Sequence, residues 1–316
     1  RLARRYKPPV LIAERLPDPE LALGFDTGRG VVNDGTIEHD AACDEFEQPR
    51  DYARAAWDTN EQVLANRDVH LKVLNEYGRR RHAGVEALSR ASLVIPPSDF
   101  LRKVHVSMGV PEGRTRWVRL GQPHFDQINR RTRRSPYYDV RPWDPKTSTT
   151  PLRLAFFGTS RPNKGLEVLT RAIPLLETHV RQRCQFTIHA LGFELGFRKR
   201  LSRFPEVAVW NGYDLLQLIG SGGDYDVGIL PHIWMENSPL VMLENFHAGK
   251  FLVCSRLGGP ADWVKDGVNG LFFSGGDEQA LARAITRLVT GDVSLPTPRQ
   301  IHESTVLQSY PGHVRE

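Results

Sequence analysis

The chain has 316 residues, of which 40% are hydrophobic and 25% charged, and this length predicts two domains. The composition excludes disordered and collagen-like chains, and no apolar run approaches the roughly 18 residues of a membrane span. The three cysteines are far apart in the sequence, which argues against a disulfide framework or a zinc cluster. We therefore expect a protein of a reducing compartment, located in the cytoplasm.

The net charge of +5 is unevenly distributed along the chain. Residues 102–146 contain 11 basic and 4 acidic side chains, four of the basic ones between Arg130 and Arg134. Such a stretch is typical of a solvated linker, and it also suits peripheral contact with an anionic membrane surface at the inner face. Few aromatic residues are interleaved with the arginines, so we expect no nucleic-acid partner.

The first half of the chain gives an irregular pattern. Pro9–Ala13 predicts a strand, residues 17–50 are acidic and rich in turn formers, and Tyr52–Ala91 predicts one long helix or two stacked helices. Leu93–Ile95 predicts a second strand, and Ser98 is a suitable N-cap for a helix that follows it.

The expected helix covers Asp99–Met108, and Arg116–Leu120 predicts one more strand. Two or three strands are fewer than a typical sheet contains. We therefore expect residues 1–125 to be an amino-terminal α/β domain whose opening strands are absent, with residues missing before Arg1. Residues 126–150 are the expected linker and residues 296–316 the expected carboxyl-terminal tail.

From Pro151 onward, short apolar runs alternate with segments of helical periodicity. Short strands alternating with helices are typical of a parallel sheet covered on both faces. We therefore predict a doubly wound α/β domain over residues 151–295, ending in a helix over Glu278–Val289 that Gly291 terminates. The six predicted strands are Leu152–Phe157, Phe186–Leu191, Val207–Trp210, Val227–Leu230, Phe251–Cys254 and Leu271–Phe273.

The most informative stretch is Pro231–Glu244, which follows one of these strands at its carboxyl end, where open α/β sheets bind ligands. Ser238 suits the N-cap of a helix, Pro239 suits its first position, and Gly249 is the expected stop. The helix would present free backbone N–H groups and the positive end of its dipole toward an anion such as a diphosphate.

Two carboxylates belong to this stretch. Glu236 precedes the predicted helix, and Glu244 lies about six helical residues, or roughly 9 Å, inside it. They could therefore meet opposite ends of an elongated ligand whose phosphates lie between them. The alternative is that both are ordinary solvated helix residues.

The loop after the first strand of this domain, Phe156–Gly165, also contains groups that suit phosphate. Lys164 could reach a phosphate as a point charge, and Arg161 could bind one bidentately. Taken alone, the loop would be better explained by a surface lysine that opens a helix.

Together these residues resemble the retaining nucleotide-sugar glycosyltransferases of family 4 (glycosyltransferase group 1), which have the GT-B fold. The shared features, in the family's order, are Lys164-Gly165, the Glu-x7-Glu pair Glu236 and Glu244, Gly258-Gly259 and the turn Asp266–Leu271. Ser98, the Gly109–Pro111 tripeptide and Leu120-Gly121 resemble the end of the family's amino domain.

The resemblance implies transfer of a sugar from a UDP- or GDP-sugar to an unidentified acceptor (a glycan, a lipid-linked molecule or a small molecule), with retention and without a metal or other cofactor. Lys164 and Glu236 would be the catalytic residues, Glu236 holding the transferred sugar and Glu244 the ribose hydroxyls. The donor site would comprise Gly158, Thr159, Arg161, Lys164, Glu236, Asn237, Ser238, Pro239, Leu240 and Glu244.

Two departures from the family pattern keep alternatives open. The family's arginine after the first glycine is Thr159 here, and His39 is a weak candidate for the catalytic histidine of the amino domain. The same fold could therefore belong to a non-catalytic nucleotide-sugar-binding scaffold, or to a nucleotide-sugar epimerase. Asp224 and Asp226 form an Asp-x-Asp pattern that could bind a cation, but we interpret Asp226 as structural.

Overall fold

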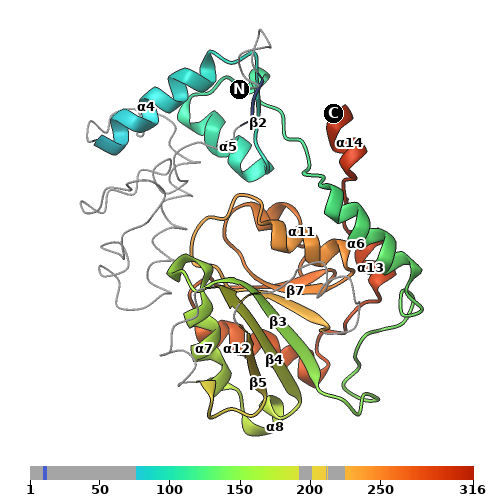
Figure 1. The fold of residues 1–316 in the computed structure, drawn as a ribbon. Helices are drawn as coiled ribbons and strands as arrows, with labels where there is room; N and C mark the ends of the chain where they lie inside the picture. Colours follow the sequence, from blue (N-terminus) through green and yellow to red (C-terminus); the bar gives the residue numbers. More distant parts are fainter. Residues whose placement is uncertain (1–9, 13–75, 192–200, 211, 213–224) are drawn as a thin grey trace.

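The computed structural model describes residues 10–12, 76–191, 201–210, 212 and 225–316. In this part of the chain a small parallel sheet precedes a larger one (Figure 1). The irregular segment 17–50, His39 and Asp224 lie outside the described residues. The same holds for the part of the predicted helical segment Tyr52–Ala91 that precedes Glu76.

The larger sheet has six strands in the order β5-β4-β3-β6-β7-β8, and every neighbouring pair is parallel. All six predicted strands are confirmed, with shifts of no more than two residues at their ends. Buried parallel strands are apolar along their whole length, which explains why they stand out in the sequence. The strands are β3 (Leu152–Thr159), β4 (Cys184–Leu191), β5 (Val207–Trp210), β6 (Val227–Leu230), β7 (Phe251–Ser255) and β8 (Gly270–Phe273).

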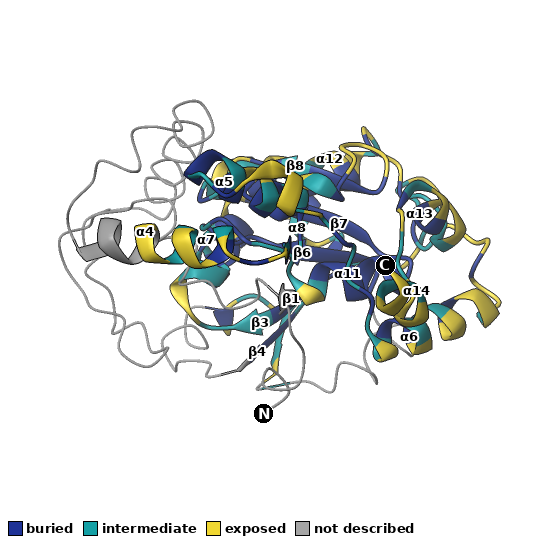
Figure 2. Ribbon diagram, turned by 90° about the horizontal axis from the view of Figure 1, so that it is seen from above, coloured by how far each residue is buried: buried dark blue, intermediate teal, exposed yellow. Residues whose placement is uncertain are grey.

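Helices cover this sheet on both faces, as a doubly wound fold requires (Figures 1 and 2). The chain passes from β3 to β4 in one direction across the sheet and from β6 to β7 in the other. Since both crossovers are expected to be right-handed, their helices lie on opposite faces, and the connection reverses between β3 and β6. The helices are α7 (Leu166–Leu175), α8 (Thr178–Arg181), α11 (Leu240–His247) and α12 (Glu278–Thr290).

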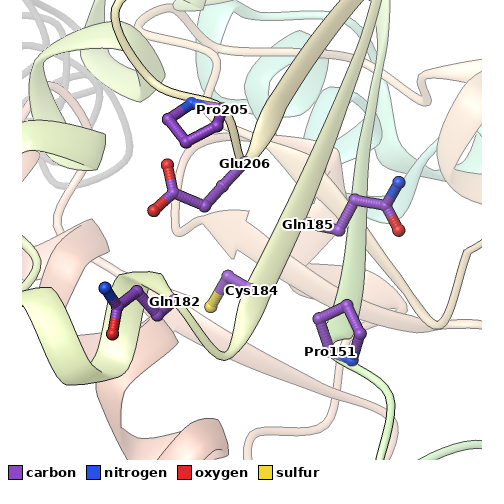
Figure 3. Close-up of a pocket in the computed structure, with 6 residues that line it drawn as sticks. All are labelled: Pro151, Gln182, Cys184, Gln185, Pro205 and Glu206. Carbon is purple, nitrogen blue, oxygen red and sulfur yellow. The ribbon is translucent and has the colours of Figure 1, made fainter.

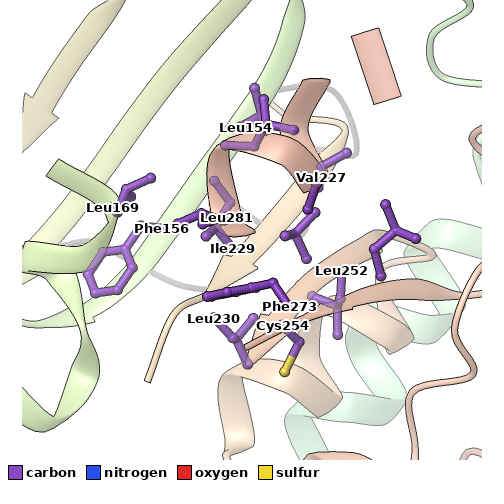
Figure 4. Packing of buried hydrophobic residues seen from close by; sticks show 14 of the residues in the cluster. Leu154, Phe156, Leu169, Val227, Ile229, Leu230, Leu252, Cys254, Phe273 and Leu281 are labelled. Carbon is purple, nitrogen blue, oxygen red and sulfur yellow. The ribbon is translucent and has the colours of Figure 1, made fainter. Parts of the chain in front are cut away.

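The core of this domain lies between the sheet and its helices (Figure 4). Leu154, Ile229, Leu252 and Leu281 come from four different elements, and each is at most 2% exposed. Burying a large aliphatic side chain contributes about 1.5–3 kcal/mol to folding. This packing gives the strand ends a rigid support.

Both ends of α12 are capped, and its stop at Gly291 was predicted. The Asp277 side chain accepts a hydrogen bond from the backbone N–H of Ala280, and the helix ends at Gly291 with φ +87°. A left-handed residue at this position favours glycine, which explains the stop.

The smaller sheet pairs β1 (Val10–Ile12) with β2 (Leu93–Ile95) in parallel, which confirms both predicted strands. α4 (Glu76–Ser89) precedes β2, and α5 (Asp99–Met108) follows it. Ser98 caps α5 as predicted, since its hydroxyl accepts from the backbone N–H of Leu101.

The prediction of a strand over Arg116–Leu120 is wrong. After the 3-10 turn η4 (Glu112–Arg114), Arg116 donates its backbone N–H to Val94, but residues 116–120 belong to no strand. Trp117 instead packs edge-on against Trp263 of the larger domain, with ring centroids 6.0 Å apart. The segment leaves the small sheet because its half-buried aromatic side chain packs against the core of the larger domain.

Three further helices are α6 (Pro123–Arg134), α13 (Pro298–Ser304) and α14 (Tyr310–Arg315). The last two lie within the expected tail, whereas α6 begins three residues before the expected linker and continues into it. α14 packs on α6, where the backbone N–H of Tyr310 donates to Asp126 at 3.1 Å. α6 ends in the arginine cluster, three of whose members lie in its last turn. None of the described helices is both long and apolar enough to cross a bilayer.

Candidate functional site

The loops after β3 and β6 meet at the point where the strand order reverses. The loop after β3 forms the 3-10 turn η5 (Pro162–Lys164) and then Gly165, whose φ is +70°. A Cβ on Gly165 would lie 1.7 Å from the carbonyl oxygen of Pro231, and Ile233 donates its N–H to the Asn163 carbonyl at 3.0 Å. These contacts place two distant segments together at the carboxyl edge of the sheet.

This contact brings Lys164 and Glu236 together as an ion pair between the Lys164 Nζ and Glu236 Oε1 atoms. Glu236 is 8% exposed. Burial alone would raise the pKa of Glu236, but the Lys164 ammonium, assisted by His232, lowers that pKa below its ordinary value. The site therefore holds a buried carboxylate beside a half-buried cation.

A glycine loop supports the backbone beside Glu236. Gly259 donates its backbone N–H to the Glu236 carbonyl at 2.6 Å, and a Cβ on Gly259 would lie 1.5 Å from the Asn237 carbonyl oxygen. The same Cβ would lie 3.0 Å from the Cβ of Ser98, and Asp262 accepts from the N–H of Phe100. The start of α5 thus contacts the carboxyl domain next to the site.

The start of α11 differs from the prediction by one residue. Pro239, not Ser238, is the N-cap, and a proline side chain has no acceptor with which to cap the helix. Because Ser238 precedes the cap, its hydroxyl is buried without a hydrogen-bond partner among the described residues. The N–H groups of the first turn of α11 are left available at the same place.

Glu244, the second acid of the motif, is 3% exposed and lies on α11. Its Oε1 lies 3.0 Å from Nε2 of His124, which belongs to α6. Burial raises the pKa of Glu244 to about 7 and lowers the pKa of His124. No sequence pattern indicated His124, because 120 residues separate it from Glu244.

Several polar atoms in and around these segments are buried without a partner in the described part of the chain. Buried polar groups are normally hydrogen-bonded, so such a concentration indicates a place where a polar ligand fits. Arg161 and Leu240 are exposed at the outer ends of the two loops, and half-buried Gly158 lies within β3. The unpartnered atoms are Thr159 Oγ1, Asn163 Oδ1, Trp234 Nε1, Asn237 Oδ1, Ser238 Oγ and Glu244 Oε2.

Asp226 is structural, as the sequence suggested. Arg153 binds both of its carboxylate oxygens, at 3.1 Å and 2.6 Å, and also donates its backbone N–H. Asp226 is 1% exposed. Within the described ranges, no group of three or more His, Cys, Asp or Glu residues is arranged to hold a metal ion.

A groove of about 520 Å³ lies at the amino-terminal ends of the strands, opposite the candidate site (Figure 3). Its one charged lining residue, Glu206, lies 3.5 Å from Arg181, and the amino ends of β3 and β4 border it. Open α/β sheets bind ligands at the opposite edge, so this groove is not a candidate donor site. Its lining residues are Pro151, Gln182, Cys184, Gln185, Pro205 and Glu206.

Comparison with known families gives a match to the same domain. Residues 151–291 match the family described as "Glycosyl transferases group 1". The matched segment contains all six strands of the larger sheet and both loops of the candidate site. This domain is therefore similar to group 1 glycosyl transferases, whereas no curated protein matches the chain.

Solved glycosyl transferase structures share the fold. HepE of Anabaena, in complex with UDP and glucose, is 18% identical with a TM-score of 0.57, over 75% of this chain and 65% of that one. Sucrose-phosphate synthase of Thermosynechococcus elongatus is 18% identical with a TM-score of 0.57, over 79% and 63%. The trehalose-phosphate synthase of Burkholderia xenovorans, in complex with glucose-6-phosphate, is 18% identical with a TM-score of 0.55. The match covers 76% of this chain and 63% of that one.

These likenesses confirm the predicted α/β fold of GT-B type. At such low identity they establish the fold alone. The chain spans somewhat less than two thirds of the length of these structures.

Proposed function

We propose that this protein transfers a sugar from a UDP- or GDP-sugar to an acceptor, with retention of the anomeric configuration and without a metal. The observation that supports this most is the set of unpartnered buried polar atoms around the Lys164–Glu236 pair, at the reversal point of a group 1 glycosyl transferase domain. Carboxylate and amide oxygens of this kind accept hydrogen bonds from sugar hydroxyls, and the serine and threonine hydroxyls can donate to phosphate oxygens.

The donor diphosphate would lie between Lys164 and the first turn of α11. The ammonium group and the helix amides stabilise the charge that develops on the departing nucleotide diphosphate. Glu236 accepts from hydroxyls of the transferred sugar, and Glu244 accepts from those of the ribose. Thr159, Asn237 and Ser238 supply further hydrogen bonds through atoms that are now unpartnered.

In the transfer step the acceptor oxygen would bond to the anomeric carbon as the bond from that carbon to the diphosphate breaks. The departing phosphate would take the acceptor's proton, and no side chain is proposed as a nucleophile. HepE binds UDP and glucose in its complex, and a donor of this type suits the site described here. Asp226 is unsuited to hold a metal because Arg153 occupies both of its oxygens.

Binding of UDP and GDP to wild type and to Glu244→Ala, measured by calorimetry, tests the donor site. The substitution should weaken nucleotide binding on the order of tenfold or more, because hydrogen bonds to a charged group are lost. Equal affinities in the two proteins would remove the site assignment. Turnover with a panel of donors tests catalysis, and full activity in Glu236→Ala would remove the role given to Glu236.

A non-catalytic nucleotide-sugar binder is the second candidate. Thr159 favours it, because this chain has a hydroxyl at the position where the family pattern has an arginine. Tight donor binding without transfer or hydrolysis would support this alternative. Conversion of the donor sugar without any acceptor would instead indicate an epimerase.

We propose that the protein is cytoplasmic, and the arginine cluster of α6 supports a peripheral contact with an anionic membrane. Arg130, Arg131, Arg133 and Arg134 are exposed, and so is Tyr137 just after the helix. Sedimentation with vesicles containing phosphatidylserine, but not with neutral ones, is expected at low salt and should weaken as salt is added. Replacement of Arg130 and Arg134 by serine should reduce the bound fraction.

A further inference from the structure

His124 lies in the first turn of α6, directly after Pro123 at the helix start. α6 packs along α11 (Figure 1), so a residue of the segment that joins the two parts of the chain reaches the donor domain. The contact between His124 Nε2 and Glu244 Oε1, at 3.0 Å, is a direct polar link between α6 and the proposed donor site.

The two oxygens of Glu244 are in different situations. Oε1 accepts the hydrogen bond from His124, whereas Oε2 is buried without a partner among the described residues. A buried carboxylate oxygen without a hydrogen bond costs free energy, about 1–3 kcal/mol for an ordinary polar group and more for a charged one. Oε2 is thus free to accept from a ligand, and its direction depends on how Oε1 is held.

The His124 ring is itself fixed by packing. It meets the Phe125 ring edge-on with centroids 4.5 Å apart, and Phe125 stacks on His247 of α11 at 4.9 Å. Phe125 is fully buried. The interface of α6 and α11 therefore sets the position of the imidazole, which in turn restricts the rotation of the Glu244 carboxylate.

We propose that His124 is a positioning residue of the donor site: it fixes the Glu244 carboxylate so that Oε2 receives the hydroxyls of the nucleotide ribose. This inference rests on the proposed function, because it takes Glu244 as the ribose acceptor. It also means that binding of the ribose depends on the docking of α6, which lies between the two parts of the chain.

The test compares nucleotides with and without the ribose hydroxyls. Affinities of UDP and GDP and of their 2′,3′-dideoxy forms are measured for wild type, His124→Leu and His124→Gln in the full chain. In wild type the natural nucleotide should bind roughly tenfold more tightly than its dideoxy form, and this affinity ratio measures what the ribose hydroxyls contribute. This ratio should fall to between one- and threefold in His124→Leu, whereas His124→Gln, whose side-chain amide can still donate, should retain most of it.

A merely structural role would weaken the natural and dideoxy nucleotides equally and leave their ratio unchanged, and this result would overturn the proposal. Loss of the ratio in His124→Gln as well as in His124→Leu, with melting temperatures like that of wild type, would also contradict it. If wild type binds no nucleotide, the proposed function fails first. If Glu244→Ala loses the ratio and His124→Leu keeps it, only the role of His124 is wrong.

Discussion

Glu244 is a buried carboxyl group whose pKa is raised by burial to about 7. It accepts ribose hydroxyls best as a carboxylate, so donor binding should be strongest above pH 7 and should weaken as the pH falls through this value. The lowered pKa of His124 leaves the imidazole largely neutral over the same range. Titration calorimetry with UDP or GDP between pH 5.5 and pH 8.5 measures this dependence. The nucleotide phosphates titrate in this range too, so a variant that lacks the Glu244 titration is needed for comparison.

Glu244→Gln is the matched control, because it keeps the shape of the side chain and cannot titrate. Its affinity should be lower at pH 8 and should retain only the pH dependence that comes from the nucleotide phosphates. If wild type and Glu244→Gln show the same pH dependence, Glu244 is not the titrating group that matters for binding.

Lys164 and Glu236 neutralise one another, and Lys164 is 34% exposed at its side chain. Lys164→Met would leave a buried carboxylate without its cation, at a cost that partial exposure limits to about 1–3 kcal/mol of unfolding free energy. The double variant Lys164→Met/Glu236→Gln should recover most of this stability and still bind donor poorly. Urea unfolding and nucleotide titration of all three proteins separate the two effects. A double variant that binds as well as wild type would contradict the role of the ammonium group.

For single residues, the sequence could predict which ones belong to a motif, but not which side chain from a distant segment would contact them. Glu236 and Glu244 were identified by their spacing, and Lys164 by the loop that precedes it. Their partners follow from the fold, since the lysine lies 72 positions before Glu236 and His124 lies 120 before Glu244. A histidine at the start of a helix has no local feature that would indicate its partner.

Among the elements, the loop that contains Gly258 and Gly259 packs against the Glu236–Asn237 backbone so closely that Gly259 should not be replaceable by a residue with a side chain. In Gly259→Ala the new Cβ would lie 1.5 Å from the Asn237 carbonyl oxygen, so the backbone on one side must move. We expect a loss of about 1–3 kcal/mol in unfolding free energy together with weaker nucleotide binding. Gly113→Ala is the control, because nothing lies within 4 Å of its Cβ. Equal urea midpoints for the two variants would show that the loop can relax without cost.

The elements that could be predicted are those whose signal is local. Each strand of the larger sheet is buried, so its residues form a continuous apolar run, and both caps of α12 are set by residues next to the helix. Arg116–Leu120 has a similar local pattern, yet Trp117 packs against Trp263, 146 residues away, instead of lying in a sheet. Such a tertiary contact outweighs the modest preference of a short segment for a strand.

At the scale of the whole molecule, buried histidines join elements that are far apart in the sequence. His302 of α13 lies between the Tyr138 hydroxyl (3.1 Å) and the carbonyl oxygen of His247 (3.1 Å), which belongs to α11. Burial lowers the pKa of His302 to about 4 and that of His247 to about 3, and burial of His105 in α5 lowers its pKa to about 4. Protonation of any of them is therefore linked to opening of the structure.

An unfolded histidine titrates near pH 6.5, so between pH 6.5 and pH 4 the unfolded chain binds more protons than the folded one. Stability should therefore be complete above pH 6.5 and fall as the pH decreases, by about 1.4 kcal/mol per pH unit for each such histidine. His302→Gln removes one titrating group and should reduce that slope by about this amount. Urea unfolding at a series of pH values measures the slope, and identical slopes for His302→Gln and wild type would show that this histidine does not link the carboxyl-terminal helices to acid stability.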